Sequence, residues 1–114
     1  MRSRLPQALA ASVATSLLLS TPAAAAPPTA TKTHVIVMDK MKFGSAPASL
    51  RVGDVIVWIN RDLFRHTATA ANKSFDVDLP PGTQKRMTVR TSGVIPYTCK
   101  FHPGMRGVLK VAAR

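Results

Sequence analysis

The chain is poor in cysteine, acidic residues and aromatic residues, and each shortage argues against a class of protein. Cys99 is the only cysteine among 114 residues, so neither an internal disulfide nor a c-type haem, which needs two cysteines, is possible. Five Asp and no Glu stand against 16 Lys and Arg. The longest basic run is Lys85-Arg86, without an accompanying aromatic series, so nucleic-acid binding is not indicated.

The first 25 residues have the pattern of a secretory signal peptide. Two arginines among the first four residues form a positive region, and the apolar stretch 8–19 follows. A run of alanines then leads to an expected cleavage point near Ala25/Ala26. The apolar stretch is too short for a membrane anchor, and no later segment is long enough to span a bilayer. We therefore expect a periplasmic protein without stable membrane insertion.

Residues 26–114 are expected to form a single basic domain. Fourteen Lys and Arg against five Asp give it a net charge of +9. Such a charge suits an acidic protein partner or an anionic surface, with the alternative that it only keeps the domain soluble. A domain this small buries a modest core, which a bound metal ion can stabilise. We expect it to be a monomer.

Short runs of β-branched and apolar residues, separated by turn residues, fill this domain. The strongest is Val55–Asn60, whose nearly continuous apolar character predicts a central strand, with Trp58 in the core. The closing strand is expected at residues 107–111. No helical period is present, and seven or eight short strands at this spacing predict an all-β antiparallel sandwich or barrel.

Three potential metal ligands lie on the loop before the closing strand. Cys99, His102 and Met105 follow one another at intervals of three residues. A thiolate, an imidazole and a thioether together favour copper, held by two histidines and one cysteine with a weak axial methionine. His66, which follows a loop after the strongest strand, is the candidate for the second histidine.

Other interpretations of these residues stay open at this stage. Zinc would accept Cys99, His66 and His102, although methionine is a poor zinc ligand. A lone cysteine in an exported protein can also be a buried apolar residue, a reactive thiol or half of an intermolecular bridge. Met105 can equally fill a gap in the core.

The remaining histidine and two methionines are expected to have structural places. His34 lies in an alternating strand and is predicted to be a surface or half-buried residue. Met38 and Met41 could form a second soft metal site, but core packing is the preferred interpretation.

The domain resembles the cupredoxins, the small blue copper proteins, over nearly its whole length. Two residues separate Cys99 from His102 and two separate His102 from Met105, a short ligand loop similar to that of amicyanin and unlike the longer one of plastocyanin. Several other segments follow the order found in the family: Met41-Lys42-Phe43, Leu50 to Asp54, Val57 to Arg61, Phe75-Asp76, Pro81-Gly82 and Tyr97-Thr98.

The resemblance implies a Greek-key β-sandwich that holds one type 1 copper ion. By position, His66, Cys99 and His102 would be equatorial ligands and Met105 the axial one. Thr67 stands where many family members have asparagine, a residue that ties the two ligand loops together. We expect its hydroxyl to take over part of that contact.

The implied function is electron transfer between redox proteins by Cu(II)/Cu(I) cycling, without catalysis. Leu63 and Phe64 would join His102 in an apolar docking patch unless they pack inward. Basic residues would attract an acidic docking surface of a dehydrogenase, cytochrome or oxidase: Arg61, Arg65, Lys100 and Arg106. The alternative is a copper carrier or buffer. An oxidase or nitrite reductase would need further copper sites, and only His34 is left unassigned.

Overall fold

The computed structural model describes residues 3–25 and 29–114. These residues contain nine β-strands. Within these two ranges there is no helix, and hence none long and apolar enough to cross a membrane. The strands are β1 Thr33–Asp39, β2 Lys42–Phe43, β3 Leu50–Arg51, β4 Val55–Asn60, β5 His66–Ala70, β6 Asp76–Leu79, β7 Gln84–Thr88, β8 Gly93–Thr98 and β9 Arg106–Ala112.

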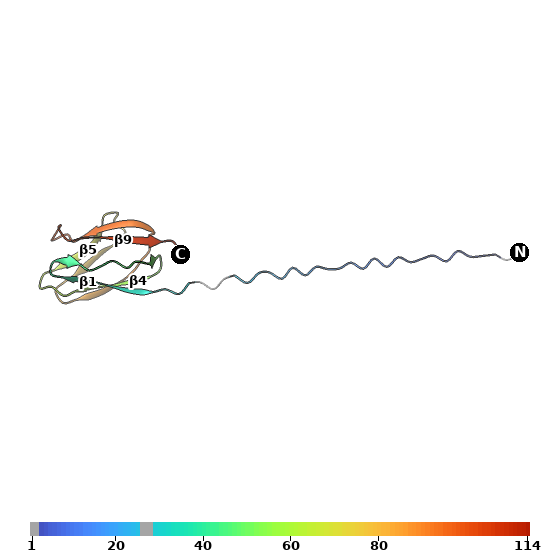
Figure 1. Cartoon of the computed structure of the whole chain (residues 1–114), viewed down its shortest axis with the longest axis horizontal. Coiled ribbons are helices and arrows are strands. Elements are labelled where there is room, and N and C mark those ends of the chain that lie inside the picture. The colour runs from blue at the N-terminus through green and yellow to red at the C-terminus, as the bar shows by residue number, and fades with distance from the viewer. Residues whose placement is uncertain (1–2, 26–28) are drawn as a thin grey trace.

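The strands form two sheets that pack face to face (Figure 1). One sheet has the order β2-β1-β4-β7 and the other β3-β9-β8-β5-β6. The predicted all-β sandwich is confirmed, although the described residues form nine strands instead of seven or eight and the sheets are mixed rather than purely antiparallel. Two neighbouring pairs, β1 with β4 and β3 with β9, are parallel, and the other pairs are antiparallel.

The parallel pairing of β1 with β4 follows from the path of the chain between them. After β2 the chain leaves the first sheet, adds the two-residue strand β3 to the second sheet, and only then returns as β4. Strands joined by such a crossover enter the sheet in the same direction. Both short strands, β2 and β3, lie on this crossing segment.

An aromatic cluster fills the space between the sheets. Trp58 on β4 is fully buried, as predicted, and its ring meets that of Tyr97 edge-on, 5.3 Å between centroids. Phe43 packs against Tyr97 at 4.8 Å. Gly107 faces Tyr97 across the β8–β9 ladder, and a Cβ there would come within 2.2 Å of the tyrosine ring. The ring therefore needs glycine at this point, and its burial raises the pKa of Tyr97 to about 12.

The N-terminal segment 3–25 is exposed and has no regular secondary structure. It extends away from the sandwich in an extended conformation (Figure 1). Arg2 and Ala26, which belong to the expected positive region and cleavage point, lie outside the described residues. The signal peptide and its boundary therefore stay predictions.

One end of the sandwich carries the loops that follow β4 and β8. Asn60, the last residue of β4, is buried there, and its side-chain amide donates to the carbonyl oxygens of Phe64 at 2.7 Å and Leu79 at 2.9 Å. Leu79 ends β6 in the opposite sheet. The amide thus holds the loop after β4 against the second sheet, where His66 begins β5.

The other end is organised by Asp54, a buried carboxylate just before β4. It accepts hydrogen bonds from the backbone N–H groups of Lys32 at 3.0 Å and Arg51 at 3.1 Å. Its oxygens also contact His34 Nε2 at 3.1 Å and Arg114 Nη2 at 2.7 Å. The backbone hydrogen bond from Lys32 is the largest effect lowering the pKa of Asp54 to about 2, against the opposing effect of burial.

We predict that acid weakens the domain through Asp54. Because its pKa is depressed in the folded state, its contribution is complete above its unfolded pKa near 4 and is lost as the pH falls towards 2. Asp54→Asn should lower the free energy of unfolding at pH 7 by on the order of 2–4 kcal/mol. It should also make the free energy of unfolding depend less on pH below about 4. Urea unfolding at a series of pH values measures both effects.

The matched control is Asp78→Asn, which breaks an exposed ion pair with Arg65. Such pairs contribute only about 0–1 kcal/mol. Equal losses of stability in the two variants would contradict the role given to Asp54.

Candidate metal centre

Two loops at the end of the sandwich opposite Asp54 bring a cysteine and two histidines together. His66 is the first residue of β5 and is fully buried. Cys99 directly follows β8 and is 1% exposed, while His102 lies half-buried in the loop to β9. Since β8 and β9 are antiparallel neighbours and β5 lies beside β8, the topology alone places both loops at one edge.

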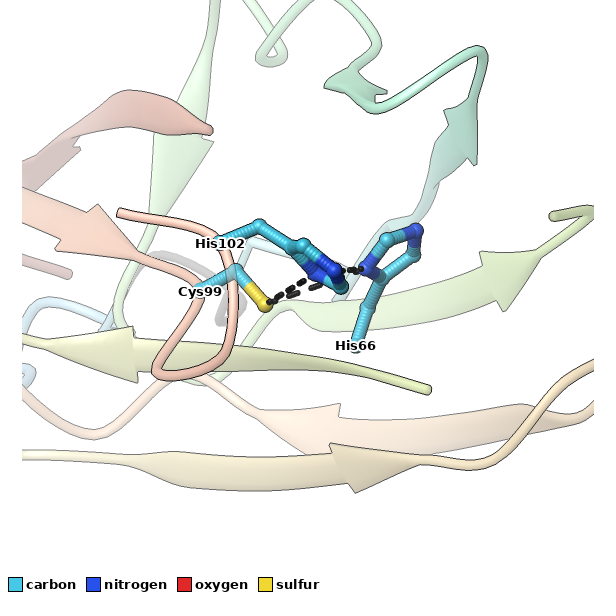
Figure 2. Close-up of side chains that lie close together, drawn as sticks. All are labelled: His66, Cys99 and His102. Carbon is cyan, nitrogen blue, oxygen red and sulfur yellow. Dashed lines mark hydrogen bonds between the residues drawn. The ribbon is translucent and has the colours of Figure 1, made fainter. Parts of the chain in front are cut away.

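The three side chains point at a common centre (Figure 2). Cys99 Sγ lies 3.8 Å from His66 Nδ1 and 3.7 Å from His102 Nδ1, and the two Nδ1 atoms are 3.1 Å apart. All three potential ligand atoms lie within 4.8 Å of one another. Within the described ranges this is the one such group of histidine, cysteine and acidic residues.

Met105 completes the loop that holds this cluster. It is 3% exposed, and its backbone N–H donates to the carbonyl oxygen of His102 at 2.9 Å. Its own carbonyl oxygen accepts from the N–H of Cys99 at 3.2 Å. These two bonds close the loop from 99 to 105 into a compact turn. The side chain of Met105 belongs to the same hydrophobic core cluster as Cys99.

The donor set fits a transition metal. One thiol and two imidazole nitrogens, held close together and largely out of water, are ligands that copper and zinc both accept. His66 Nε2 contacts the carboxylate of Asp62 at 2.7 Å. Because a carboxylate only accepts, Nε2 carries a proton, so Nδ1 is the nitrogen of His66 that can bind a metal ion at the cluster.

Comparison with known proteins gives this arrangement a family. No family model matches the chain. Amicyanin from Paracoccus denitrificans is 30% identical over 83 residues, covering 68% of this chain and 63% of that protein. The chain therefore spans less than two thirds of the length of that curated relative.

Solved structures agree with the sequence relationship. A reduced Cu(I) form of an amicyanin variant is 28% identical, with a TM-score of 0.55, and covers 70% of this chain and 80% of its own. The chain is an amicyanin-like cupredoxin. A copper-containing nitrite reductase from Thermus scotoductus, 24% identical, shares the fold, with a TM-score of 0.60 over 82% of this chain and 25% of that one.

In this cupredoxin Asp62 is a functional residue that sequence reasoning missed. Its carboxylate binds His66 and also accepts from the N–H groups of Lys40 at 2.8 Å and Met41 at 3.0 Å. Burial acts to raise the pKa of Asp62, but the hydrogen bond with His66 and the two backbone donors outweigh it and hold the pKa below its usual value. The available signal was an acidic residue four positions before a candidate ligand.

Thr67 joins the two ligand loops of the cupredoxin through its hydroxyl group. Its Oγ1 accepts from the N–H of Lys100 at 2.9 Å. Its backbone N–H also donates to Cys99 Sγ at 3.3 Å, a contact the sequence did not predict. Thr67, the residue after His66, therefore contacts both Cys99 and the residue that follows it, Lys100.

Three large apolar side chains are exposed on the two loops that carry His66 and His102. Leu63 is 89% exposed, Phe64 57% and Phe101 52%. The alternative that Leu63 and Phe64 pack inward is therefore wrong. The ring of Phe64 meets that of His102 edge-on at 6.0 Å, so the histidine lies among exposed apolar side chains.

Two of the four basic residues expected to flank this surface are already paired. Arg65 binds Asp78 at 2.6 Å and lies over the ring of Phe101, and Lys100 binds Asp76. Arg61 and Arg106 have no acidic partner within the described part of the chain. The positive charge available near His102 is therefore smaller than the sequence predicted.

The other soft or basic ligands lie away from the cluster or are used elsewhere. His34 is bound to Asp54 at the opposite end of the sandwich and is half-buried, as predicted. Met38 is fully buried in the core, which confirms its packing role. Met41 is 36% exposed, so core packing does not describe it.

We predict that Asp62 sets the metal affinity of this site. Asp62→Ala removes the partner that orients the ring and fixes the tautomer of His66, so the affinity should fall by about 10- to 100-fold. Competition with a chromophoric chelator for Cu²⁺ or Zn²⁺ measures it. Asp39→Ala, an exposed aspartate at the end of β1, is the control for lost charge and should leave the affinity near wild type.

Proposed function

We propose that this cupredoxin binds one copper ion through His66, Cys99 and His102, with Met105 as the axial ligand, and carries single electrons between redox proteins. The observation that carries the proposal is the convergence of one thiol and two imidazoles in a largely buried cluster. Copper bound there would supply a Cu(II)/Cu(I) couple. The amicyanin relative and the Cu(I) amicyanin structure support this choice of metal over zinc.

The protein contributes a site whose parts are already held in place. Asp62 fixes the ring of His66, and Thr67 ties the segment after it to Cys99 and Lys100. Ligands that do not move between two oxidation states keep the reorganisation cost of electron transfer small. The same enclosure favours retention of the metal, and therefore an electron carrier rather than a copper donor or buffer. We propose no catalytic reaction for the domain.

His102 is the proposed exit for the electron. It is the least buried member of the cluster, its ring meets the exposed ring of Phe64, and the exposed Phe101 precedes it in the chain. An apolar patch made by Leu63, Phe64 and Phe101 allows a partner to approach closely and exclude water. We propose an acidic docking surface on that partner, because Arg61 and Arg106 leave positive charge beside the patch.

We propose that residues 1–25 are a signal peptide and that the domain works in the periplasm. The support is the order of positive, apolar and small residues, together with an exposed segment 3–25 that takes no part in the sandwich. The mass of the protein recovered from a periplasmic extract tests the cleavage near Ala25/Ala26. An intact N-terminus would contradict it.

We predict that Cu(II) added to the purified domain gives an intense blue band from the copper–thiolate bond. Cys99→Ser should abolish the band, because an alcohol cannot replace the thiolate in this transition. Visible absorption measures it. A colourless protein that retains zinc in preference to copper would overturn the proposed function.

Met105→Gln is the matched variant on the same loop. If Met105 is the axial ligand, the blue colour should remain while the reduction potential falls, since the axial ligand tunes the potential more than it sets the colour. Cyclic voltammetry measures the potential. An unchanged potential would assign Met105 to core packing alone.

We predict that positive charge near His102 speeds reaction with anions. Reduction of the Cu(II) protein by hexacyanoferrate(II) should slow as salt rises, because the ions screen the attraction. The variant Arg61→Gln/Arg106→Gln should be several-fold slower at low salt. Lys85→Gln/Arg86→Gln on β7 removes equal charge elsewhere and should change the rate less. A stopped-flow reduction rate that does not change with salt concentration would contradict this electrostatic attraction.

A further inference from the structure

A chain of two hydroxyl groups leads from the backbone beside Cys99 to the carboxylate of Asp76. The N–H of Lys100 donates to Thr67 Oγ1 at 2.9 Å. Thr67 Oγ1 lies 2.9 Å from Thr69 Oγ1, and Thr69 Oγ1 donates to Asp76 Oδ1 at 2.8 Å. The register of β5 with β6, in which Thr69 faces Asp76, brings the last pair together.

The chemistry of the groups fixes the direction of this chain. An ionised carboxylate has no proton to give, so Thr69 donates its only hydroxyl proton to Asp76. Thr69 Oγ1 must then accept from Thr67, and Thr67 in turn has only lone pairs to offer to the N–H of Lys100. Asp76 therefore decides which way both hydroxyl groups point.

The chain closes on itself at Lys100. The ammonium group of Lys100 binds Asp76 Oδ2, the second oxygen of the carboxylate. The backbone and the side chain of the same residue are thus joined to one carboxylate by two routes. This ion pair, followed by the hydrogen bond from Thr69, lowers the pKa of Asp76, so the carboxylate stays ionised at neutral pH.

This chain of hydrogen bonds connects the residues that directly follow two of the potential metal ligands. Lys100 follows Cys99, and Thr67 follows His66. The backbone N–H of Thr67 also donates to Cys99 Sγ at 3.3 Å. A rotation of the Thr67 hydroxyl away from Lys100 would remove one of the two hydrogen bonds by which Thr67 holds this loop and leave the contact with the sulfur as the other.

We propose that Asp76, acting through Thr69 and Thr67, is a positioning residue of the metal centre. It sets the orientation of the hydroxyl that joins the two ligand loops, and thereby the contact between the Thr67 N–H and the sulfur of Cys99. The effect on a bound copper ion rests on the proposed function, whereas the effect on the loops belongs to the protein without metal. Hydrogen bonds to the sulfur tune the potential of such a site.

Asp78 provides a matched control on the same strand. It lies two residues from Asp76, has the same charge and binds Arg65 of the other ligand loop at 2.6 and 2.8 Å. Neither threonine hydroxyl is among its hydrogen-bond partners in the described residues. Asp76→Ala and Asp78→Ala therefore each remove one exposed ion pair and one negative charge, but only the first breaks the chain.

The first test needs no metal. In the metal-free protein, NMR hydrogen exchange of the Lys100 amide should be about tenfold faster in Asp76→Ala and stay within about twofold of wild type in Asp78→Ala. Thr69→Val, which keeps the ion pair of Lys100 with Asp76, should act like Asp76→Ala. Thr69→Ser keeps the hydroxyl group, so exchange of the Lys100 amide should stay as slow as in the wild type. Equal exchange in the two aspartate variants, or slow exchange in Thr69→Val, would overturn the proposal.

The second test uses the copper-loaded protein. Both aspartate variants lose the same charge, so a purely electrostatic effect would shift their reduction potentials alike. If Asp76 positions the Thr67 N–H on the sulfur, the potential of Asp76→Ala should lie below that of Asp78→Ala, and the blue band should shift only in the former. Equal potentials would overturn the link to the metal centre. Failure of the wild type to bind copper would instead overturn the proposed function, and the exchange experiment would still decide the proposal for the loops.

Discussion

The hydrogen bond from the Thr67 N–H to the sulfur of Cys99 joins two segments that are 32 residues apart in the chain, and it ties together the two loops that supply the site. His66 reaches the cluster because β5 begins beside it, and His102 reaches it because the loop after Cys99 folds back through Met105. The two sheets supply the rigid frame, and Asn60 holds the first loop against the second sheet. A metal ion would then enter a site that the protein has already assembled.

Acidic residues are scarce, and four of the five aspartates have distinct places. Asp54 gathers donors at one end, Asp62 orients His66, and Asp76 and Asp78 bind the two ligand loops through Lys100 and Arg65. Four of the five carboxylates are thus bound to basic or histidine side chains. The excess of basic residues is left on the surface, where it acts on molecules that approach from solution.

Sequence reasoning reached the sandwich and the central strand β4, because these follow from local patterns. It grouped His66 with Cys99 and His102 from ligand chemistry and from the resemblance to the cupredoxins. It missed what depends on register. Thr69 meets Asp76 only because β5 and β6 pair in one particular register, and the same pairing places Asp78 within reach of Arg65. Because Arg65 and Lys100 are paired with Asp78 and Asp76, less positive charge is available near His102 than the sequence predicted. The parallel β1–β4 pair escaped as well, since a crossover between sheets leaves no mark on the alternation of residues.

The two ends of the chain that forms the sandwich meet at Asp54, far from the metal centre. Lys32, where the N-terminal segment joins β1, and Arg114 both bind this carboxylate, and Figure 1 shows the two ends of the chain leaving the same side of the sandwich. A tether attached at either point would therefore hold the domain with His102 facing outward. The fold is thus suited to immobilisation on an electrode, where the face that exchanges electrons has to remain free.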